Sequence, residues 1–398
     1  MSGIAPDRGT VIGFRFQLQV LGRRYIAILH HSSSHHFSRR QFLQSAIASA
    51  SGLALSGCGW TLAEVRPLPG KPTAANELYI YTWSNYIDAD LLREFTAQTG
   101  IRVIADTFDA NETMLATFQA GKGAAYSIVY PSDYSVAKML ELKLLRELEQ
   151  SKIAGLENIL PKFRASVHDP GNRHHVPISW GTTGLIYNSD KINPPPDDWN
   201  YLWKNQEKLT GRITLLNDTR EVFGAALRSL GYSYNSTNPN EIQAAFEKLK
   251  VLKPAIASFT TDGWRDQLLA GDLVMAMGFS IDGVLVAQEN PKIEYVVPQS
   301  GTSLWSDTMV IPKNAPNQDA AYAWINYMLQ PAVASQVTER LFFATPNKAA
   351  FDQLPAPIRN NEALFPPDSI LKNSQGIVPL PRAAEELYAK YWTILNSS

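Results

Sequence analysis

The sequence has very little cysteine and no excess of charge of either sign. Cys58 is the single cysteine among 398 residues, so a disulfide within the chain is excluded. The 36 basic and 37 acidic residues leave a net charge of −1, and no basic stripe marks a nucleic-acid surface. At 45% hydrophobic residues, the chain suits a globular protein of one large or two medium domains.

Motifs of common enzyme classes are missing too. We find no Gly-x-Ser-x-Gly, no His-Glu-x-x-His and no glycine-rich phosphate loop. His168, His174 and His175 precede a predicted hinge and have no evident nucleophile as a partner. A secreted hydrolase is therefore only a remote alternative, and we expect a protein that is not an enzyme and uses no cofactor or metal.

The first 58 residues have the features of an export signal. A charged pair precedes an alanine-rich run that is too short and too weakly apolar to span a membrane. Ser38-Arg39-Arg40-Gln41-Phe42-Leu43 resembles the twin-arginine motif, and Leu55-Ser56-Gly57-Cys58 resembles a lipobox, whose cysteine is lipidated. We predict a leader at residues 1–57 and a lipid-anchored tether at residues 58–76, with a chance cysteine as the alternative.

From residue 77 onward, extended segments alternate with helical ones. Repeated strand–helix units of this kind predict a mostly parallel sheet flanked by helices. The predicted strands are 78–82, 101–106 and 127–130, and the helices 89–99, 111–120 and 135–142. Trp83-Ser84-Asn85-Tyr86 and Ser132-Asp133-Tyr134 follow two of these strands, so they fall on the same sheet edge, where α/β proteins bind ligands.

A second strand–helix region lies between two long extended stretches, 175–187 and 302–312, which we predict to cross between domains. One of its strands ends at Asp218 and another at Asp282. Asp218 and Glu221 have the spacing of a capping box at a helix start, so a purely structural role is the alternative for both.

Four separated motifs occur in an order typical of one known family. They are Leu78-Tyr79-Ile80-Tyr81-Thr82-Trp83-Ser84-Asn85-Tyr86, Tyr130-Pro131-Ser132-Asp133-Tyr134, Asn217-Asp218-Thr219-Arg220-Glu221-Val222-Phe223 and Trp305-Ser306-Asp307. Together they resemble the bacterial periplasmic polyamine-binding proteins, the spermidine/putrescine receptors of ABC importers. The resemblance covers about residues 77–398 in co-linear order. It implies the two-lobed type II periplasmic binding protein fold, an α/β fold whose lobes share hinge crossings and close over the ligand.

The resemblance implies an organisation and a function for the whole chain. Residues 77–180 and 306–350 would form the N-terminal lobe, and residues 181–305 and 351–398 the C-terminal lobe. A monomeric periplasmic receptor would capture putrescine or spermidine between them and deliver it to the permease and ATPase subunits of an inner-membrane ABC importer. Another small cationic or zwitterionic solute in the same fold is the alternative.

The resemblance also assigns ligand-binding residues, motif by motif. They are Trp83, Ser84, Asn85, Tyr86, Ser132, Tyr134, Asp218, Glu221, Phe279, Asp282, Trp305, Asp307 and Phe343. Asn85 stands where members often carry a carboxylate. Phe279 and Phe343 stand where members usually have a tryptophan and a tyrosine.

These residue types suit a linear polyamine, which needs separated carboxylates for its ammonium groups and aromatic faces for its methylenes. A charge-assisted hydrogen bond contributes roughly 1.5–3 kcal/mol, and a cation–π contact about 0.5–2 kcal/mol. Asp307 lies in an otherwise apolar stretch, where an unpaired carboxylate is costly to bury. A core position is the alternative for Trp305 and for Phe343.

Overall fold

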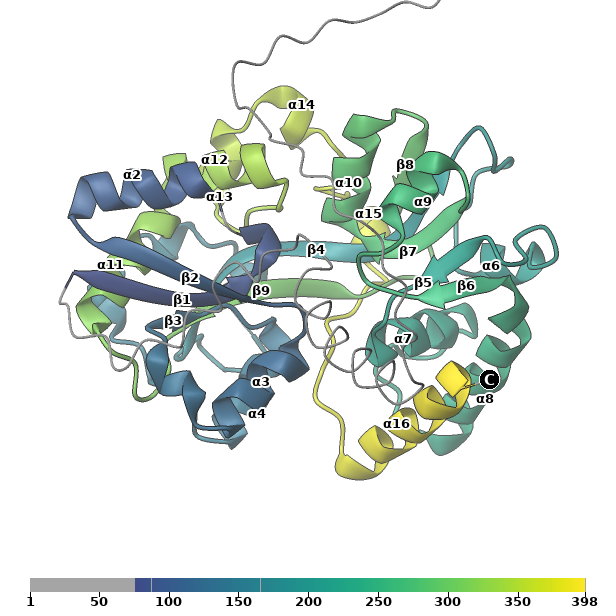
Figure 1. The fold of residues 1–398 in the computed structure, drawn as a ribbon, viewed down its shortest axis with the longest axis horizontal. Helices are drawn as coiled ribbons and strands as arrows, with labels where there is room; N and C mark the ends of the chain where they lie inside the picture. Colours follow the sequence, from purple (N-terminus) through teal and green to yellow (C-terminus); the bar gives the residue numbers. More distant parts are fainter. Residues whose placement is uncertain (1–75, 87, 165, 398) are drawn as a thin grey trace, which may run out of the picture. The chain divides into compact units, whose positions relative to one another are not determined.

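The computed structural model describes residues 76–86, 88–164 and 166–397 (Figure 1). The predicted leader, the tether up to residue 75 and the candidate lipidation site Cys58 lie outside the described residues. All of the described residues fall in one compact unit. In the described part of this unit, no helix is both long and apolar enough to cross a lipid bilayer.

The described residues contain a nine-stranded sheet with the order β2-β1-β3-β9-β4-β7-β5-β6, and β8 pairs with β4 outside this path. The strands are β1 (Glu77–Trp83), β2 (Arg102–Phe108), β3 (Ile128–Val129), β4 (His175–Asn188), β5 (Ile213–Leu215), β6 (Ile256–Phe259), β7 (Met275–Phe279), β8 (Ile293–Val296) and β9 (Leu304–Val310).

Parallel pairing is confined to the two ends of this strand order. β2, β1 and β3 are parallel in what we call the near lobe, and β6, β5 and β7 are parallel in the far lobe. β4 pairs antiparallel with β9 over residues 175–182 and with β7 over residues 183–187, so it passes from one group to the other (Figure 1). The predicted two-lobed α/β fold with crossing strands is confirmed.

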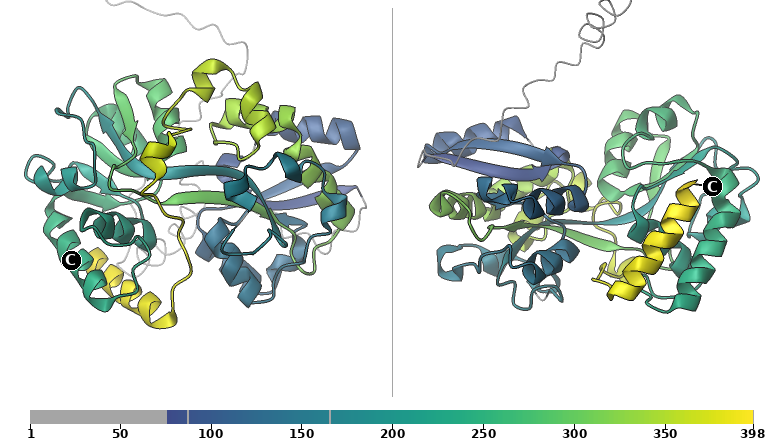
Figure 2. Two further views of the ribbon diagram at one scale, coloured as in Figure 1. Left: turned by 180° about the vertical axis from the view of Figure 1, so that it is seen from behind. Right: turned by 60° about the horizontal axis from the view of Figure 1, so that its bottom comes forward.

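Helices cover both faces of the near-lobe sheet (Figure 2). Leu78 and Ile80 of β1 pack toward one core, while Tyr79 and Tyr81, which alternate with them, pack toward the opposite one. The near-lobe helices are α2 (Ala89–Thr99), α3 (Asn111–Gln119), α4 (Asp133–Glu141), α5 (Pro161–Arg164), α11 (Gln318–Leu329), α12 (Pro331–Leu341) and α13 (Lys348–Gln353).

The far lobe repeats this arrangement. Met275 and Met277 of β7 pack into one core and Ala276 into another, and the C-terminal helix lies beside α8 (Figure 2). The remaining helices are α6 (Asn200–Lys204), α7 (Thr219–Ser229), α8 (Pro239–Leu252), α9 (Arg265–Ala270), α10 (Ser280–Glu289), α14 (Ala356–Arg359), α15 (Asp368–Leu371) and α16 (Arg382–Ser397).

Helix α2 shows why the near-lobe elements begin and end where they do. Asp88 Oδ1 accepts hydrogen bonds from the backbone N–H groups of Asp90 (2.8 Å) and Leu91 (3.2 Å), which satisfies two of the free donors at the helix start. Gly100 ends the helix with a φ of 71°, a left-handed conformation that glycine adopts without steric cost.

Helix α4 begins two residues earlier than the sequence predicted, at Asp133. Ser132 stands at its N-cap position, but the hydroxyl makes no capping hydrogen bond. It donates instead to Asp307 Oδ1 at a distance of 2.8 Å. A residue that looks like a helix cap is thus directed toward another strand.

The grouping of buried residues supports a division at the crossing strands, although the predicted lobe boundaries stay a prediction. Trp180 belongs to a near-lobe core and Leu185 to a far-lobe core, five positions further along β4. Phe365, which the prediction gives to the C-terminal lobe, packs edge-on against Trp180 with ring centroids 6.1 Å apart.

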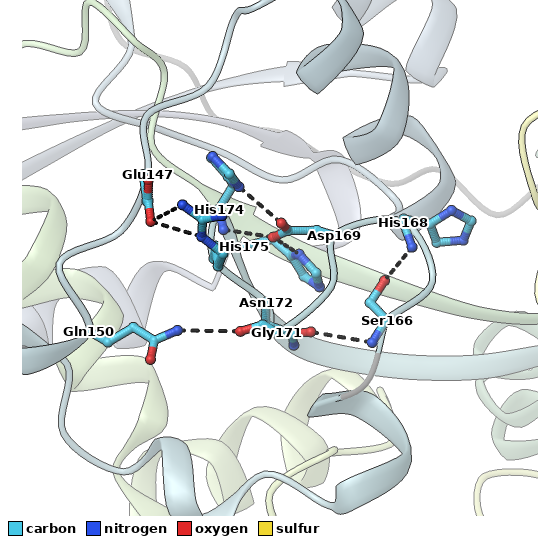
Figure 3. A network of polar contacts seen from close by, with 10 residues as sticks. Glu147, Gln150, Ser166, His168, Asp169, Gly171, Asn172, His174 and His175 are labelled. Carbon is cyan, nitrogen blue, oxygen red and sulfur yellow. Dashed lines mark hydrogen bonds and ion pairs between the residues drawn. The ribbon is translucent and has the colours of Figure 1, made fainter.

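His174, which precedes β4, and His175, its first residue, belong to a polar network around Asp169 (Figure 3). His174 Nδ1 and His175 Nδ1 each lie 2.9 Å from a carboxylate oxygen of Asp169. Burial acts to raise the pKa of Asp169, but the hydrogen bonds from the two histidines lower it to about 2. This network holds the turn that leads into the crossing strand.

Candidate functional site

A cavity of about 180 Å³ is lined by residues of both lobes. Every ligand-binding residue predicted from the sequence lines it: Trp83, Ser84, Asn85, Tyr86, Ser132, Tyr134, Asp218, Glu221, Phe279, Asp282, Trp305, Asp307 and Phe343. The strand ends that the sequence placed on one edge therefore do meet around one cavity. Whether these side chains contact a ligand stays a prediction.

Asp307 of the crossing strand β9 is the central acid of this cavity. Only 7% of the residue is exposed. Ser132 Oγ donates to one carboxylate oxygen at 2.8 Å, and the Tyr86 hydroxyl donates to the other at 2.9 Å. Burial raises the pKa of Asp307 to about 6, and these donors act against it. Among the described residues, no lysine, arginine or histidine forms an ion pair with Asp307.

Aromatic rings of the near lobe line the same cavity as this acid. Tyr86 stacks on Phe343 with ring centroids 4.0 Å apart, and its hydroxyl also bonds to Ser179. Burial and the nearby Asp307 raise the pKa of Tyr86 well above its ordinary value, so its hydroxyl keeps its proton. Trp83 packs against Phe108 with centroids 4.5 Å apart. Ser84 and Asn85 are exposed and hydrogen-bonded to each other.

Trp305, two residues before Asp307 on β9, packs edge-on against Phe279, with ring centroids 5.8 Å apart. Gly181 of β4 makes room for it, since a Cβ there would overlap the indole ring. The Nε1 atoms of Trp305 and Trp83 are buried without a hydrogen-bond partner in the protein. Trp305 packs against the near-lobe core, as its alternative role required, but its ring also lines the cavity.

The far lobe contributes the acidic pair Asp218 and Glu221. Asp218 caps helix α7, accepting from the N–H groups of Arg220 (2.8 Å) and Glu221 (3.0 Å), so the capping alternative describes a real contact. Glu221 accepts from the Tyr234 hydroxyl at 2.6 Å and from Ser303 Oγ at 2.8 Å. Burial and the neighbouring Asp218 raise the pKa of Glu221 to about 7. Burial also raises the pKa of Asp218.

Asp282 of the first turn of α10 differs from the other acids, because a basic side chain of the protein is bound to it. Its side chain is 3% exposed, and Arg265 Nη2 donates to Oδ1. Burial raises the pKa of Asp282 to about 6, against the lowering effect of Arg265 and of the N–H of Phe279.

Two functional candidates were missed from the sequence. Asn111 is buried and its Nδ2 donates to Tyr134 (2.9 Å) and Ser132 (3.2 Å), so it orients two predicted residues. It follows the end of β2, and the strand-end rule that selected Trp83 would have found it. Arg265, the first residue of α9, gave no signal, because it does not follow a predicted strand end. In the described part of the chain, no cluster of histidine, cysteine and acidic side chains has the arrangement of a metal site.

Comparison with known proteins identifies a family and relatives of similar length. Residues 90–366 match the family model described as bacterial extracellular solute-binding protein. The spermidine/putrescine-binding periplasmic protein of Escherichia coli K12 is 36% identical over 323 residues, which are 81% of this chain and 92% of that protein. The putrescine-binding periplasmic protein SpuD of Pseudomonas aeruginosa is 32% identical over 337 residues, covering 80% of this chain and 92% of SpuD.

Solved structures agree with this family match. The spermidine/putrescine ABC transporter substrate-binding protein PotD from Streptococcus pneumoniae superposes with a TM-score of 0.74 at 36% identity, covering 81% of this chain and 99% of that one. The Tp0655 (TpPotD) lipoprotein of Treponema pallidum gives a TM-score of 0.73 at 28% identity, covering 81% of this chain and 100% of that one.

Proposed function

Because the chain belongs to the bacterial extracellular solute-binding protein family, we propose that it captures a linear polyamine, putrescine or spermidine, in the cavity between its lobes. The observation that carries the proposal is Asp307, a buried carboxylate with neutral donors only, in a cavity that aromatic rings also line. An ammonium group placed there would supply the charge partner that the described residues do not.

The rest of the cavity suits the remainder of such a ligand. The ring faces of Trp83, Tyr86 and Trp305 can contact the methylenes and the ammonium groups of the ligand. Cation–π contacts contribute about 0.5–2 kcal/mol each, most where water is excluded. The Asp218–Glu221 pair offers a second anionic position in the other lobe. Relatives named for spermidine and putrescine support this ligand class.

The proposal extends to delivery and location. The chain would act as a monomeric periplasmic receptor and not as an enzyme. It would deliver its ligand to the permease and ATPase of an ABC importer, since a related structure is named an ABC transporter substrate-binding protein.

The lipobox-like sequence supports lipidation at Cys58 after export by the twin-arginine route. Expression of Cys58→Ala beside the wild type, followed by membrane fractionation and fatty-acid labelling, tests the anchor. Label retained by the variant would contradict it.

Calorimetric titration of the purified mature protein tests the ligand class. The panel is putrescine, spermidine, spermine and γ-aminobutyrate, the last as a zwitterionic control. We expect saturable binding of putrescine or spermidine with a Kd of about 10 µM or tighter, which corresponds to roughly −7 kcal/mol. The absence of heat and of any thermal shift with both polyamines would refute the proposal, and selective binding of γ-aminobutyrate would favour the zwitterionic alternative.

A further inference from the structure

One wall of the proposed polyamine cavity already holds a cation of the protein itself. Arg265 begins helix α9, and its guanidinium is bound to the carboxylate of Asp282, which lines the cavity from α10. The Arg265 side chain is 33% exposed, whereas that of Asp282 is 3% exposed. The acid is therefore enclosed, and its charge partner reaches it from the more open side.

The hydrogen-bonding capacity of Asp282 is also used within the protein. Asp282 is the third residue of α10 and accepts from the N–H of Phe279, the residue at the N-cap position. This is the return half of a capping box. Asp282 thus has an internal charge partner and an internal backbone donor, while Asp307 has neutral donors alone.

The position of Arg265 is set by its neighbours. Trp264, the preceding residue, is fully buried, and the Arg265 guanidinium lies 5.9 Å from the centre of its ring. The nearest other acid, Asp262, is 3.9 Å from the guanidinium and largely exposed, so solvent weakens its pull. Asp282 is therefore the principal partner of Arg265.

We propose that Arg265 is a specificity-determining residue that occupies the ammonium position at Asp282. The cavity then accepts ligand ammonium groups at two places, Asp307 and the Asp218–Glu221 pair, and its preferred ligand is a diamine. The third ammonium of a triamine would meet a carboxylate that is already neutralised. This inference rests on the proposed polyamine function and narrows it to a ligand class.

Other acids near the cavity do not replace the missing position. Asp109 and Asp262 line its rim and are exposed to solvent. Burial and the nearby Asp218 raise the pKa of the Glu112 carboxyl, so Glu112 belongs with the Asp218–Glu221 position and not with Asp282. Exposed carboxylates are screened by water and salt, so they discriminate weakly between ligands of different charge. The contrast between a neutralised Asp282 and an unpaired Asp307 therefore decides how many buried ammonium sites the ligand finds.

The Arg265→Gln variant tests the inference through the ratio of the Kd values for spermidine and putrescine. The wild type is expected to bind putrescine at least as tightly as spermidine. In Arg265→Gln, Asp282 becomes available, so the ratio should shift toward spermidine by about tenfold or more, as for other desolvated charge pairs. The matched control is Arg212→Gln, an exposed arginine of the same lobe outside the cavity, which should leave the ratio unchanged.

The double variant Arg265→Gln/Asp282→Asn gives a second measurement. It leaves no unpaired buried charge at this position that could destabilise the fold. It should abolish the shift toward spermidine that Arg265→Gln produces, returning the Kd ratio to within about threefold of the wild-type ratio. A shift toward spermidine that persists in this variant, tighter spermidine binding by the wild type, or an unchanged ratio in Arg265→Gln would each overturn the inference. Failure of the wild type to bind either polyamine would instead refute the proposed function.

Discussion

Asp307 and Asp282 lie in the same cavity, both are buried, and burial raises the pKa of each to about 6. They differ in their partners. Asp307 is held by the neutral hydroxyls of Ser132 and Tyr86, whereas Asp282 is bound to the guanidinium of Arg265. Burial and a shifted pKa are thus not enough to identify a ligand-binding acid. The charge of the group that faces it distinguishes a vacant cation position from an occupied one.

The largest change in ligand affinity should come from lowering the pH. The pKa values of Asp307 and Glu221 are raised to about 6 and about 7, above the ordinary values of about 4. In the unliganded folded protein, both carboxyls therefore stay protonated to a higher pH than ordinary carboxyls do. An ammonium ligand binds their ionised forms. Affinity should be full near pH 8 and fall by about 100-fold or more by about pH 5, as the carboxyls are protonated.

Calorimetry across this pH range measures that loss. The ligand does not titrate there, because alkyl ammonium groups have pKa values of about 10. An affinity that is constant, or that rises toward acid pH, would contradict the assignment of buried acids to the site.

The comparison of the two acids is tested most directly by amide substitutions. Asp307→Asn keeps the shape but removes the charge, so the Kd for putrescine should rise by about tenfold or more, as for the loss of a desolvated charge pair. The matched variant is Arg265→Gln/Asp282→Asn, which neutralises the other acid together with its partner. Equal losses in the two proteins would abolish the distinction between them.

A third buried acid, Asp169, serves as a contrast outside the cavity. Its histidine partners lower its pKa to about 2, below the ordinary value of about 4, so its contribution to stability is present above about pH 4 and is lost as pH falls toward 2. Asp169→Asn should reduce the free energy of unfolding by about 1–3 kcal/mol at neutral pH.

Urea denaturation measures this change, and titration with putrescine is the control. The Kd of Asp169→Asn should stay within about threefold of the wild type, since the network lies apart from the cavity-lining residues. A large change in Kd with unaltered stability would place Asp169 among the functional acids.

The smallest effect is expected at the rim. Asn85 is exposed and lines the cavity. Asn85→Asp should tighten putrescine binding by about twofold to fivefold at low salt, because exposed ion pairs contribute roughly 0.2–1 kcal/mol. The gain should disappear at high ionic strength. A gain that persists in salt would show that Asn85 is enclosed in the liganded state.

Much of the fold was predictable because local signals agreed with it. The crossing strands were visible as long extended stretches, and β4 and β9 lie where they were predicted. The first wall of the cavity followed from strand ends alone, since the carboxyl ends of parallel strands share an edge. The role of Ser132 was not predictable, because the residue stands at the N-cap position of α4 but donates its hydroxyl to Asp307, 175 positions away.

The sequence by itself determined the alternation of strands and helices, the strand ends that carry aromatic and acidic residues, and the order of the family motifs. Tertiary structure alone decided which acids are charge-paired. Tyr86 and Asp307 are 221 positions apart, and Arg265 and Asp282 lie on separate helices. Periodicity and spacing report on neighbours within about two helical turns. When the charge partner of an acid lies on a different helix or strand, the packing of the sheet and its crossing strands decides which residue that partner is.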